Sequence, residues 1–154
     1  MEKKSITRRK FMSTAALTAG ALIVKPRFIS GSEANSAIRI GLLGCGGRGT
    51  AVAQGFVKNR NNNCRITAIA DLFDDQLQKA KKLWDGVAEK NGHPGIDPKF
   101  MFKGPDAYQQ IANCKDLDVI IISSPDYFHS QHLEAVIEAG KHCYCEKPAG
   151  VDVA

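Results

Sequence analysis

The sequence predicts an α/β fold whose core is a doubly wound parallel sheet. From residue 38 onward, short apolar runs alternate with segments of helical periodicity. A glycine-rich turn follows the first apolar run, and a β-branched run at 118–122 is typical of a central strand buried on both faces. Strands that alternate with helices pair in parallel through right-handed crossovers, which gives the doubly wound class.

The elements follow one another with short connections. The expected strands cover residues 38–43, 65–70, 100–102, 118–122 and 142–145. The expected helices cover residues 50–58, 74–90, 106–113 and 126–139. The segment 91–98 holds two prolines and two glycines, so it is expected to be a loop, and Gly140 is expected to cap the last helix. We therefore expect one domain over residues 37–154.

The positive charge of the chain is concentrated at its start. The net charge is +5, and residues 1–34 hold seven Lys or Arg against two Glu, which is the whole surplus. The other residues carry 14 basic and 14 acidic side chains, so no basic face is left for a phosphate backbone. The 44% hydrophobic content also argues against a disordered chain. Nucleic acid is therefore not an expected partner.

Residues 1–34 are predicted to be an export signal. A basic start precedes an apolar stretch of about 14 residues, Phe11–Val24, which is shorter than the roughly 20 residues that cross a membrane. Residues 7–12 resemble the twin-arginine motif, with Arg8 and Arg9 before Phe11. An amphipathic helix on a membrane surface is the alternative, although the apolar residues run all round the helix. We expect export to the periplasm and no stable membrane span, with cleavage after Ala34 or an uncleaved leader.

The cysteines are expected to be buried thiols and not metal ligands. There are five, an odd number, with no C-x-x-C pair and no histidine at a zinc spacing. They are Cys45, Cys64, Cys114, Cys143 and Cys145. Free thiols agree with the twin-arginine route, which exports proteins already folded in the reducing cytoplasm. No metal site is expected.

The glycine-rich turn is the first candidate ligand site. Gly44, Cys45, Gly46, Gly47, Arg48 and Gly49 satisfy G-x-G-x-x-G directly after a strand and at the start of a helix. There, glycines let backbone N–H groups at the helix start approach a pyrophosphate, and Arg48 is a candidate for a further phosphate contact. The alternative is a structural turn without a ligand.

Asp71 is the second candidate, at the end of the second expected strand. A carboxylate there accepts hydrogen bonds from the adenosine ribose hydroxyls and repels a 2′-phosphate, so NAD is favoured over NADP. Asp71 lies 27 residues after Gly44, more than the usual ~20, and the polar insert at 59–63 accounts for the excess. The alternative is that Asp71 caps the next helix.

Two further segments carry a family resemblance. They are Ser123-Ser124-Pro125-Asp126-Tyr127-Phe128-His129 and Gly140-Lys141-His142-Cys143-Tyr144-Cys145-Glu146-Lys147-Pro148. With the glycine turn, they resemble the glucose-fructose oxidoreductase, inositol dehydrogenase and MocA family over about residues 37–154. The resemblance implies a Rossmann domain that binds NAD, with NADP possible, followed in the family by a second domain that supplies most of the sugar or polyol pocket.

The resemblance also implies roles for individual residues. Ser123, Ser124 and Pro125 would lie under the nicotinamide end, with His129 bracing their loop. Glu146 would contact the nicotinamide ribose, and Lys147 would be the catalytic lysine that assists proton removal from the substrate hydroxyl. The alternatives are a surface charge for Lys147, an ordinary helix residue for His129 and a capping pair for Ser124 and Asp126. His93, His132 and His142 match no family role and are expected at the surface or in a strand.

The sequence leaves several functions open. The chain ends six residues after Pro148, before the family's last Rossmann strand and its second domain. We therefore expect the chain by itself to turn over no sugar, and to form a homo-oligomer only with that domain present. The primary hypothesis is an exported oxidoreductase acting on a sugar or cyclitol hydroxyl. The alternatives are a non-catalytic dinucleotide-binding module that pairs with another chain, and part of an NAD-dependent glycosidase with a similar Gly-Gly-Arg-Gly loop.

Overall fold

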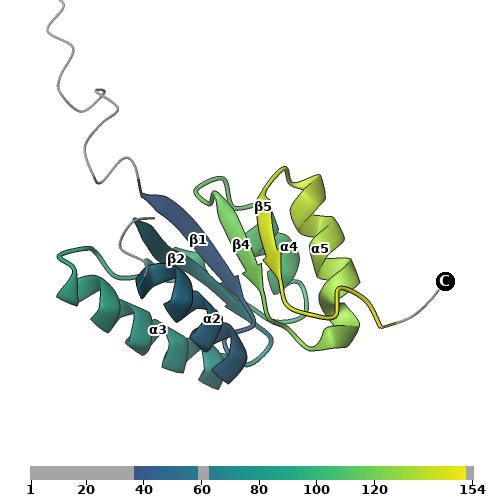
Figure 1. Ribbon diagram of the computed structural model, residues 1–154. Coiled ribbons are helices and arrows are strands. Elements are labelled where there is room, and N and C mark those ends of the chain that lie inside the picture. Colours follow the sequence, from purple (N-terminus) through teal and green to yellow (C-terminus); the bar gives the residue numbers. More distant parts are fainter. Residues whose placement is uncertain (1–36, 59–62, 152–154) are drawn as a thin grey trace, which may run out of the picture. The chain divides into compact units, whose positions relative to one another are not determined.

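The computed structural model describes residues 37–58 and 63–151. The predicted leader, residues 1–34, lies outside the described residues, and it falls in a unit separate from residues 36–154. The described unit is a five-stranded, all-parallel sheet flanked by helices (Figure 1). This confirms the predicted fold class.

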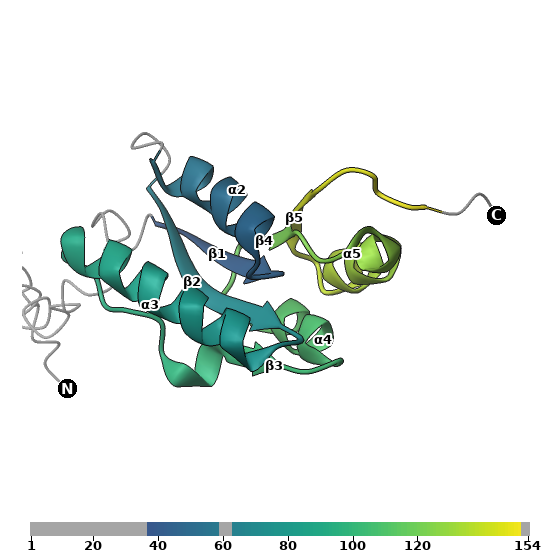
Figure 2. The same cartoon turned by 90° about the horizontal axis from the view of Figure 1, so that it is seen from below.

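The sheet has the order β3-β2-β1-β4-β5. The strands are β1 (Ile38–Leu43), β2 (Cys64–Asp71), β3 (Met101–Lys103), β4 (Val119–Ile122) and β5 (His142–Cys145). The chain moves outward from β1 to β3, then crosses back to β4 on the other side of β1. That reversal makes the carboxyl ends of β1 and β4 a topological switch point, where ligands bind in open α/β sheets. The arrows of β1 and β2 run in the same direction in Figure 2.

The helices divide between the two faces of the sheet. They are α2 (Gly47–Lys58), α3 (Asp74–Lys90), α4 (Ala107–Ala112) and α5 (His129–Glu138), with short 3₁₀ helices η3 (Pro98–Phe100) and η4 (Asp126–Phe128). Ala53 of α2 and Trp84 of α3 share one core cluster with Ile121 of β4. Ile111 of α4 and Val136 of α5 share the other with Ile120. Thus β4 is buried on both faces, as its β-branched run predicted.

The predicted starts of two helices were wrong. The first helix begins at Gly47, inside the glycine motif, and not at Thr50. The Thr50 N–H donates to the Gly46 carbonyl, so the turn passes directly into the helix. The last helix begins at His129, because residues 126–128 form η4 and not α-helix. Gly140, with φ +69°, ends that helix as predicted.

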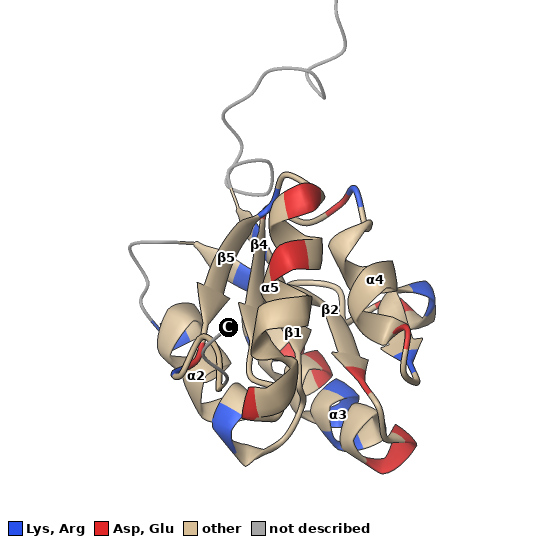
Figure 3. Cartoon of the chain, turned by 90° about the vertical axis from the view of Figure 1, so that its right-hand side faces the viewer, with Lys and Arg blue, Asp and Glu red and all other residues tan. Residues whose placement is uncertain are grey.

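The surface of the described unit mixes charges of both signs. Figure 3 shows Lys and Arg interspersed with Asp and Glu along its helices and loops. No described helix is long and apolar enough to span a membrane.

Candidate functional site

The glycine turn is shaped by two close approaches. Gly44 has φ +94°, and a Cβ there would lie 2.5 Å from the Ser123 main chain. A Cβ on Gly49 would lie 2.0 Å from the Gly44 carbonyl oxygen. Neither position has room for a side chain, so the end of β1 packs directly against the end of β4 and against the first turn of α2.

The other two glycines of the motif serve a different purpose. A Cβ on Gly46 or Gly47 would have no atom within 4 Å, so their backbone borders open space. They lie at the start of α2, where main-chain N–H groups have no partner within the helix. Free N–H groups facing open space at a helix start form an anion site that fits a pyrophosphate.

Asp71 joins the end of β2 to this turn. Its Oδ2 accepts a hydrogen bond from the Cys45 main-chain N–H at 2.7 Å, and its Oδ1 accepts from the Phe73 N–H at 2.9 Å. Asp71 is not the cap of α3, because the N-cap position is Phe73, which makes no side-chain cap. The carboxylate is therefore fixed in place, and each oxygen keeps a lone pair for a ribose hydroxyl.

Cys45 takes part in the glycine turn through its main-chain N–H, which binds Asp71, and not through its thiol. Its side chain is buried, and its Sγ lies 3.5 Å from the Ala70 carbonyl oxygen. Burial, and then the charge of Asp71, raise the pKa of the Cys45 thiol to about 12. Burial likewise raises the pKa of Cys143 to about 11. None of the five cysteines is in a disulfide, and each is buried or half-buried, as the sequence predicted.

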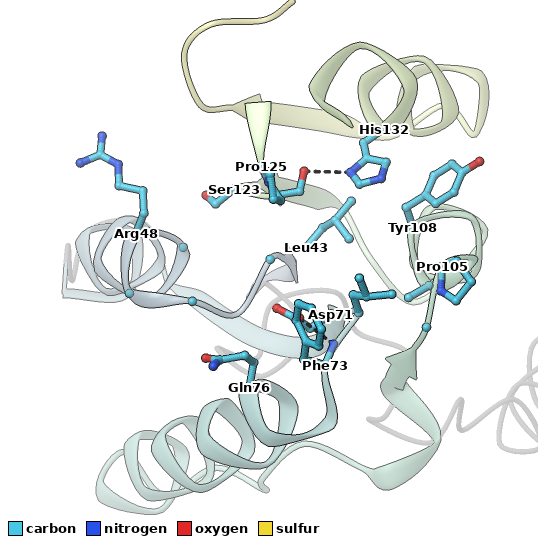
Figure 4. A pocket seen from close by; sticks show the side chains of 18 residues that line it. Leu43, Arg48, Asp71, Phe73, Gln76, Pro105, Tyr108, Ser123, Pro125 and His132 are labelled. Atoms are coloured by element: carbon cyan, nitrogen blue, oxygen red, sulfur yellow. Dashed lines mark hydrogen bonds between the residues drawn. The ribbon is translucent and has the colours of Figure 1, made fainter. Parts of the chain in front are cut away.

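A cavity of about 580 Å³ connects these residues at the carboxyl ends of the strands. Its walls include the glycine turn, Asp71 and Phe73, the segment Gly104–Pro105, and the residues Tyr108, Ser123, Ser124, Pro125 and His132. In Figure 4, Asp71 and Phe73 lie on one side of it, and His132 and Tyr108 on the other. Most of the predicted cofactor residues are thus brought into one space.

Arg48 points away from the centre of that cavity (Figure 4). Its Nη2 donates to both carboxylate oxygens of Glu146, at 2.8 and 3.0 Å. The hydrogen bond from Arg48 lowers the pKa of Glu146 below its usual range, against the opposing effect of burial, and the Tyr144 hydroxyl also donates to this carboxylate. Arg48 is therefore an ion-pair partner that ties the start of α2 to the end of β5.

His129 ties the loop after β4 to the segment after β5. It is 1% exposed, and its Nε2 lies 2.8 Å from the Ser124 carbonyl oxygen. Its Nδ1 lies 2.6 Å from the Pro148 carbonyl oxygen. Because a carbonyl oxygen only accepts, each contact is made when the facing ring nitrogen carries a proton. Neither Ser124 nor Asp126 caps the helix that follows them, since the N-cap of η4 is Pro125 and makes no side-chain cap.

Glu146 and Lys147 follow β5, next to Arg48 of the glycine turn. Glu146 is buried, whereas Lys147 is exposed and precedes a cis proline peptide bond. Neither residue is among those that line the cavity. The described residues therefore do not bring Lys147 into the desolvated surroundings that the family resemblance implies for it.

His132 is buried and does not lie at the surface, contrary to the expectation from the sequence. Its Nδ1 lies 2.9 Å from the Ser124 Oγ, and its ring stacks on Tyr108. The only signal in the sequence was its spacing, since His132 follows His129 by three positions on one helix face. Tyr108 and Phe73 carried no such signal, because a single sequence does not show which segments meet at the edge of the sheet.

Comparison with known proteins agrees with this geometry. Residues 38–154 match the family GFO_IDH_MocA, described as "Oxidoreductase family, NAD-binding Rossmann fold". The chain belongs to this family. The described unit is accordingly an NAD-binding Rossmann domain.

Individual relatives cover the chain but extend beyond it. A glycosyl hydrolase family 109 protein of Solibacter usitatus is 31% identical over 157 residues, 97% of this chain and 34% of its own length. One from Shewanella amazonensis is 31% identical over 118 residues, 75% of this chain and 24% of its own. The chain thus spans about a quarter to a third of the curated relatives that it matches.

A solved structure of the same fold holds the cofactor. It is scyllo-inositol dehydrogenase of Lactobacillus casei with bound NAD(H) and scyllo-inositol, 27% identical with a TM-score of 0.57. The match covers 75% of this chain and 29% of that one.

The glycine turn yields the first prediction. Gly46→Ala should leave the free energy of unfolding within about 0.5 kcal/mol of the wild type, because its Cβ meets no atom. It should weaken NADH binding about tenfold or more, since the Cβ stands where the pyrophosphate approaches. Gly49→Ala should instead lower the free energy of unfolding by about 2 kcal/mol or more, because its Cβ collides with the Gly44 carbonyl. Urea unfolding and NADH titration measure both. Equal stability of the two variants would contradict this account.

His132 yields a prediction on pH. Burial, and secondly the charge of His129, lower the pKa of His132 to about 4. Because this value lies below that of the unfolded chain, about 6.5, the contribution to stability is complete above pH 6.5 and is lost as the pH falls towards 4. From pH 7 to pH 5, the wild type should lose about 1 to 2 kcal/mol more than His132→Phe, measured by urea unfolding. His142→Phe, which removes an exposed histidine, should keep the wild-type slope.

Proposed function

We propose that this chain is the NAD-binding part of an enzyme that removes a hydride from a sugar or cyclitol carbon bearing a hydroxyl group. The main support for the proposal is that the glycine turn and the Asp71 carboxylate, which is fixed by hydrogen bonds, line the same cavity. These two features match the two ends of an adenosine diphosphate group, the pyrophosphate and the ribose diol.

The residues of the chain fit NAD in a defined way. N–H groups at Gly46 and Gly47 would hold the pyrophosphate, while Asp71 would accept hydrogen bonds from the adenosine ribose. NAD, when bound, supplies the hydride acceptor. Lys147, one residue beyond the end of the Arg48–Glu146 ion pair, would assist removal of the proton from the substrate hydroxyl.

The substrate class rests on relatives. The structure of scyllo-inositol dehydrogenase contains a cyclitol beside NAD(H), which favours a polyhydroxylated ring as the substrate. The curated relatives named glycosyl hydrolase family 109 favour a second candidate, an NAD-dependent glycosidase. In that branch, bound NAD is reduced and reoxidised in each cycle, so NADH does not accumulate. Steady NADH release from a sugar by the enzyme that contains this domain would identify a dehydrogenase, and release of the aglycone without NADH a glycosidase.

Cofactor choice provides the direct test. The 154-residue chain, titrated with NADH and NADPH in parallel by calorimetry, should bind NADH more tightly, because the Asp71 carboxylate repels a 2′-phosphate. Asp71→Asn should weaken NADH about tenfold and narrow the preference over NADPH. Asp116→Asn is the matched control, since its side chain is 64% exposed at the opposite end of the sheet. A folded chain that binds neither nucleotide would refute the proposal. It would also refute the alternative of a non-catalytic dinucleotide-binding module.

We also propose that residues 1–34 direct export to the periplasm by the twin-arginine route. The support is the order of basic, apolar and polar zones and the Arg8-Arg9 pair before Phe11. A fluorescent protein fused after residue 36 should reach the periplasm of a bacterium with a twin-arginine translocase. Replacing Arg8 and Arg9 by Lys should retain it in the cytoplasm. Equal distribution of the two fusions would contradict the proposal.

A further inference from the structure

His132 makes a specific contact that neither the fold nor the family assigns. Its Nδ1 lies 2.9 Å from the hydroxyl oxygen of Ser124, which lines the cavity that contains Asp71. The dashed line at His132 in Figure 4 marks this contact. Two aromatic rings stack on the imidazole. The Tyr108 ring stacks on it with centroids 4.6 Å apart, and the Phe128 ring with centroids 5.7 Å apart. The two stacked rings therefore restrict the plane of the imidazole, and the contact with Ser124 sets the direction of Nδ1 within that plane.

Two of the polar atoms of Ser124, its carbonyl oxygen and its Oγ, are held by one helix. Its carbonyl oxygen accepts from His129 Nε2 and its hydroxyl pairs with His132 Nδ1, so α5 sets both the backbone and the side chain. An unsupported serine hydroxyl rotates freely about its Cβ–Oγ bond. A hydroxyl with one fixed partner presents its remaining hydrogen-bonding positions in fixed directions, which is the arrangement that a ligand site requires.

The protonation state of His132 suits this role. Burial, with a smaller effect from His129, lowers its pKa to about 4, so the ring is neutral at neutral pH. A neutral imidazole has one N–H donor and one acceptor nitrogen, and it can complete a hydrogen bond with a hydroxyl in either direction. It also adds no positive charge to the cavity.

The position of Ser124 indicates which part of the cofactor it faces. The cavity that Ser124 lines is the one that contains Asp71 and Phe73 at the end of β2. Glu146 and Lys147, which follow β5 and would serve the nicotinamide, do not line it. Because a carboxylate at the end of β2 binds the adenosine ribose, this cavity corresponds to the adenosine half of the dinucleotide.

We propose that His132 is a positioning residue that orients the Ser124 hydroxyl toward the adenosine half of NAD, with Tyr108 and Phe128 fixing the histidine ring. This inference rests on the proposed function. The family resemblance implied instead that Ser124 lies under the nicotinamide end of NAD. A probe that lacks nicotinamide distinguishes these two positions of Ser124.

The test is a double-mutant cycle with two probes, NADH and ADP-ribose. His132→Phe keeps an aromatic ring against Tyr108 and Phe128 but removes the nitrogen that contacts Ser124. His132→Phe and Ser124→Ala should each weaken both probes by a similar factor of about three to ten. In the double variant, the loss should equal that of Ser124→Ala alone, since His132 acts only through the hydroxyl. His132→Asn, whose side chain places a polar atom near the position of Nδ1, should restore part of the affinity.

Controls separate this role from a purely structural one. Thermal unfolding of each variant should show a folded chain, and His142→Phe should bind both probes as the wild type does. Additive losses in the double variant, or a loss for NADH without a loss for ADP-ribose, would overturn the inference. If the wild type binds neither probe, the proposed function itself fails. If the wild type binds both and the variants bind equally well, only this inference fails.

Discussion

The close approach of β1 to β4 at Gly44 is the constraint on which the rest of the structure depends. A side chain at Gly44 would meet the Ser123 main chain, and one at Gly49 would meet the Gly44 carbonyl. Because neither position has a side chain, the end of β1 lies against the end of β4. Helix α2 then begins at Gly47, four residues after Leu43, the last residue of β1. The unpaired N–H groups at the start of α2 consequently face the carboxyl edge of the sheet. A looser turn would move the helix start away from the switch point between β1 and β4.

Asp71 joins this turn to the next strand and so has two functions at once. Its carboxylate receives N–H groups from the glycine turn and from the segment before α3. The same oxygens are those expected to receive the ribose hydroxyls. Pre-existing hydrogen bonds remove rotational freedom from the carboxylate before a ligand arrives, which reduces the entropy lost on binding. Loss of Asp71 should therefore change both the order of the turn and its affinity for NAD.

At the ends of β4 and β5, side-chain hydrogen bonds and an ion pair hold the site together, whereas the glycine turn depends on its backbone conformation. Arg48 of α2 reaches Glu146 after β5, 98 residues away in sequence. His129 connects the Ser124 carbonyl with the Pro148 carbonyl, and His132 holds the Ser124 hydroxyl. Together these contacts tie the ends of β4 and β5 to α2 and α5. Each of the two histidines is buried, so water competes little for its hydrogen bonds.

The sequence by itself determined the elements, their parallel arrangement and the turn. Periodicity located all five strands and four helices, because a helix or strand repeats over a few residues and leaves a local pattern. The spacing of glycines identified the turn, and the place of Asp71 after an apolar run identified the acidic partner. The predicted helix starts failed at Gly47 and His129, where local hydrogen bonds of a turn or a 3₁₀ helix decide where the α-helix begins.

Only the tertiary structure decided which side chains meet. The pairing of Arg48 with Glu146, the stacking of His132 on Tyr108, and the absence of Lys147 from the lining of the Asp71 cavity depend on residues distant in sequence. The type of residue at one position does not show which residue it will contact. The energy of a contact depends on both partners together, and they meet only when the chain has folded.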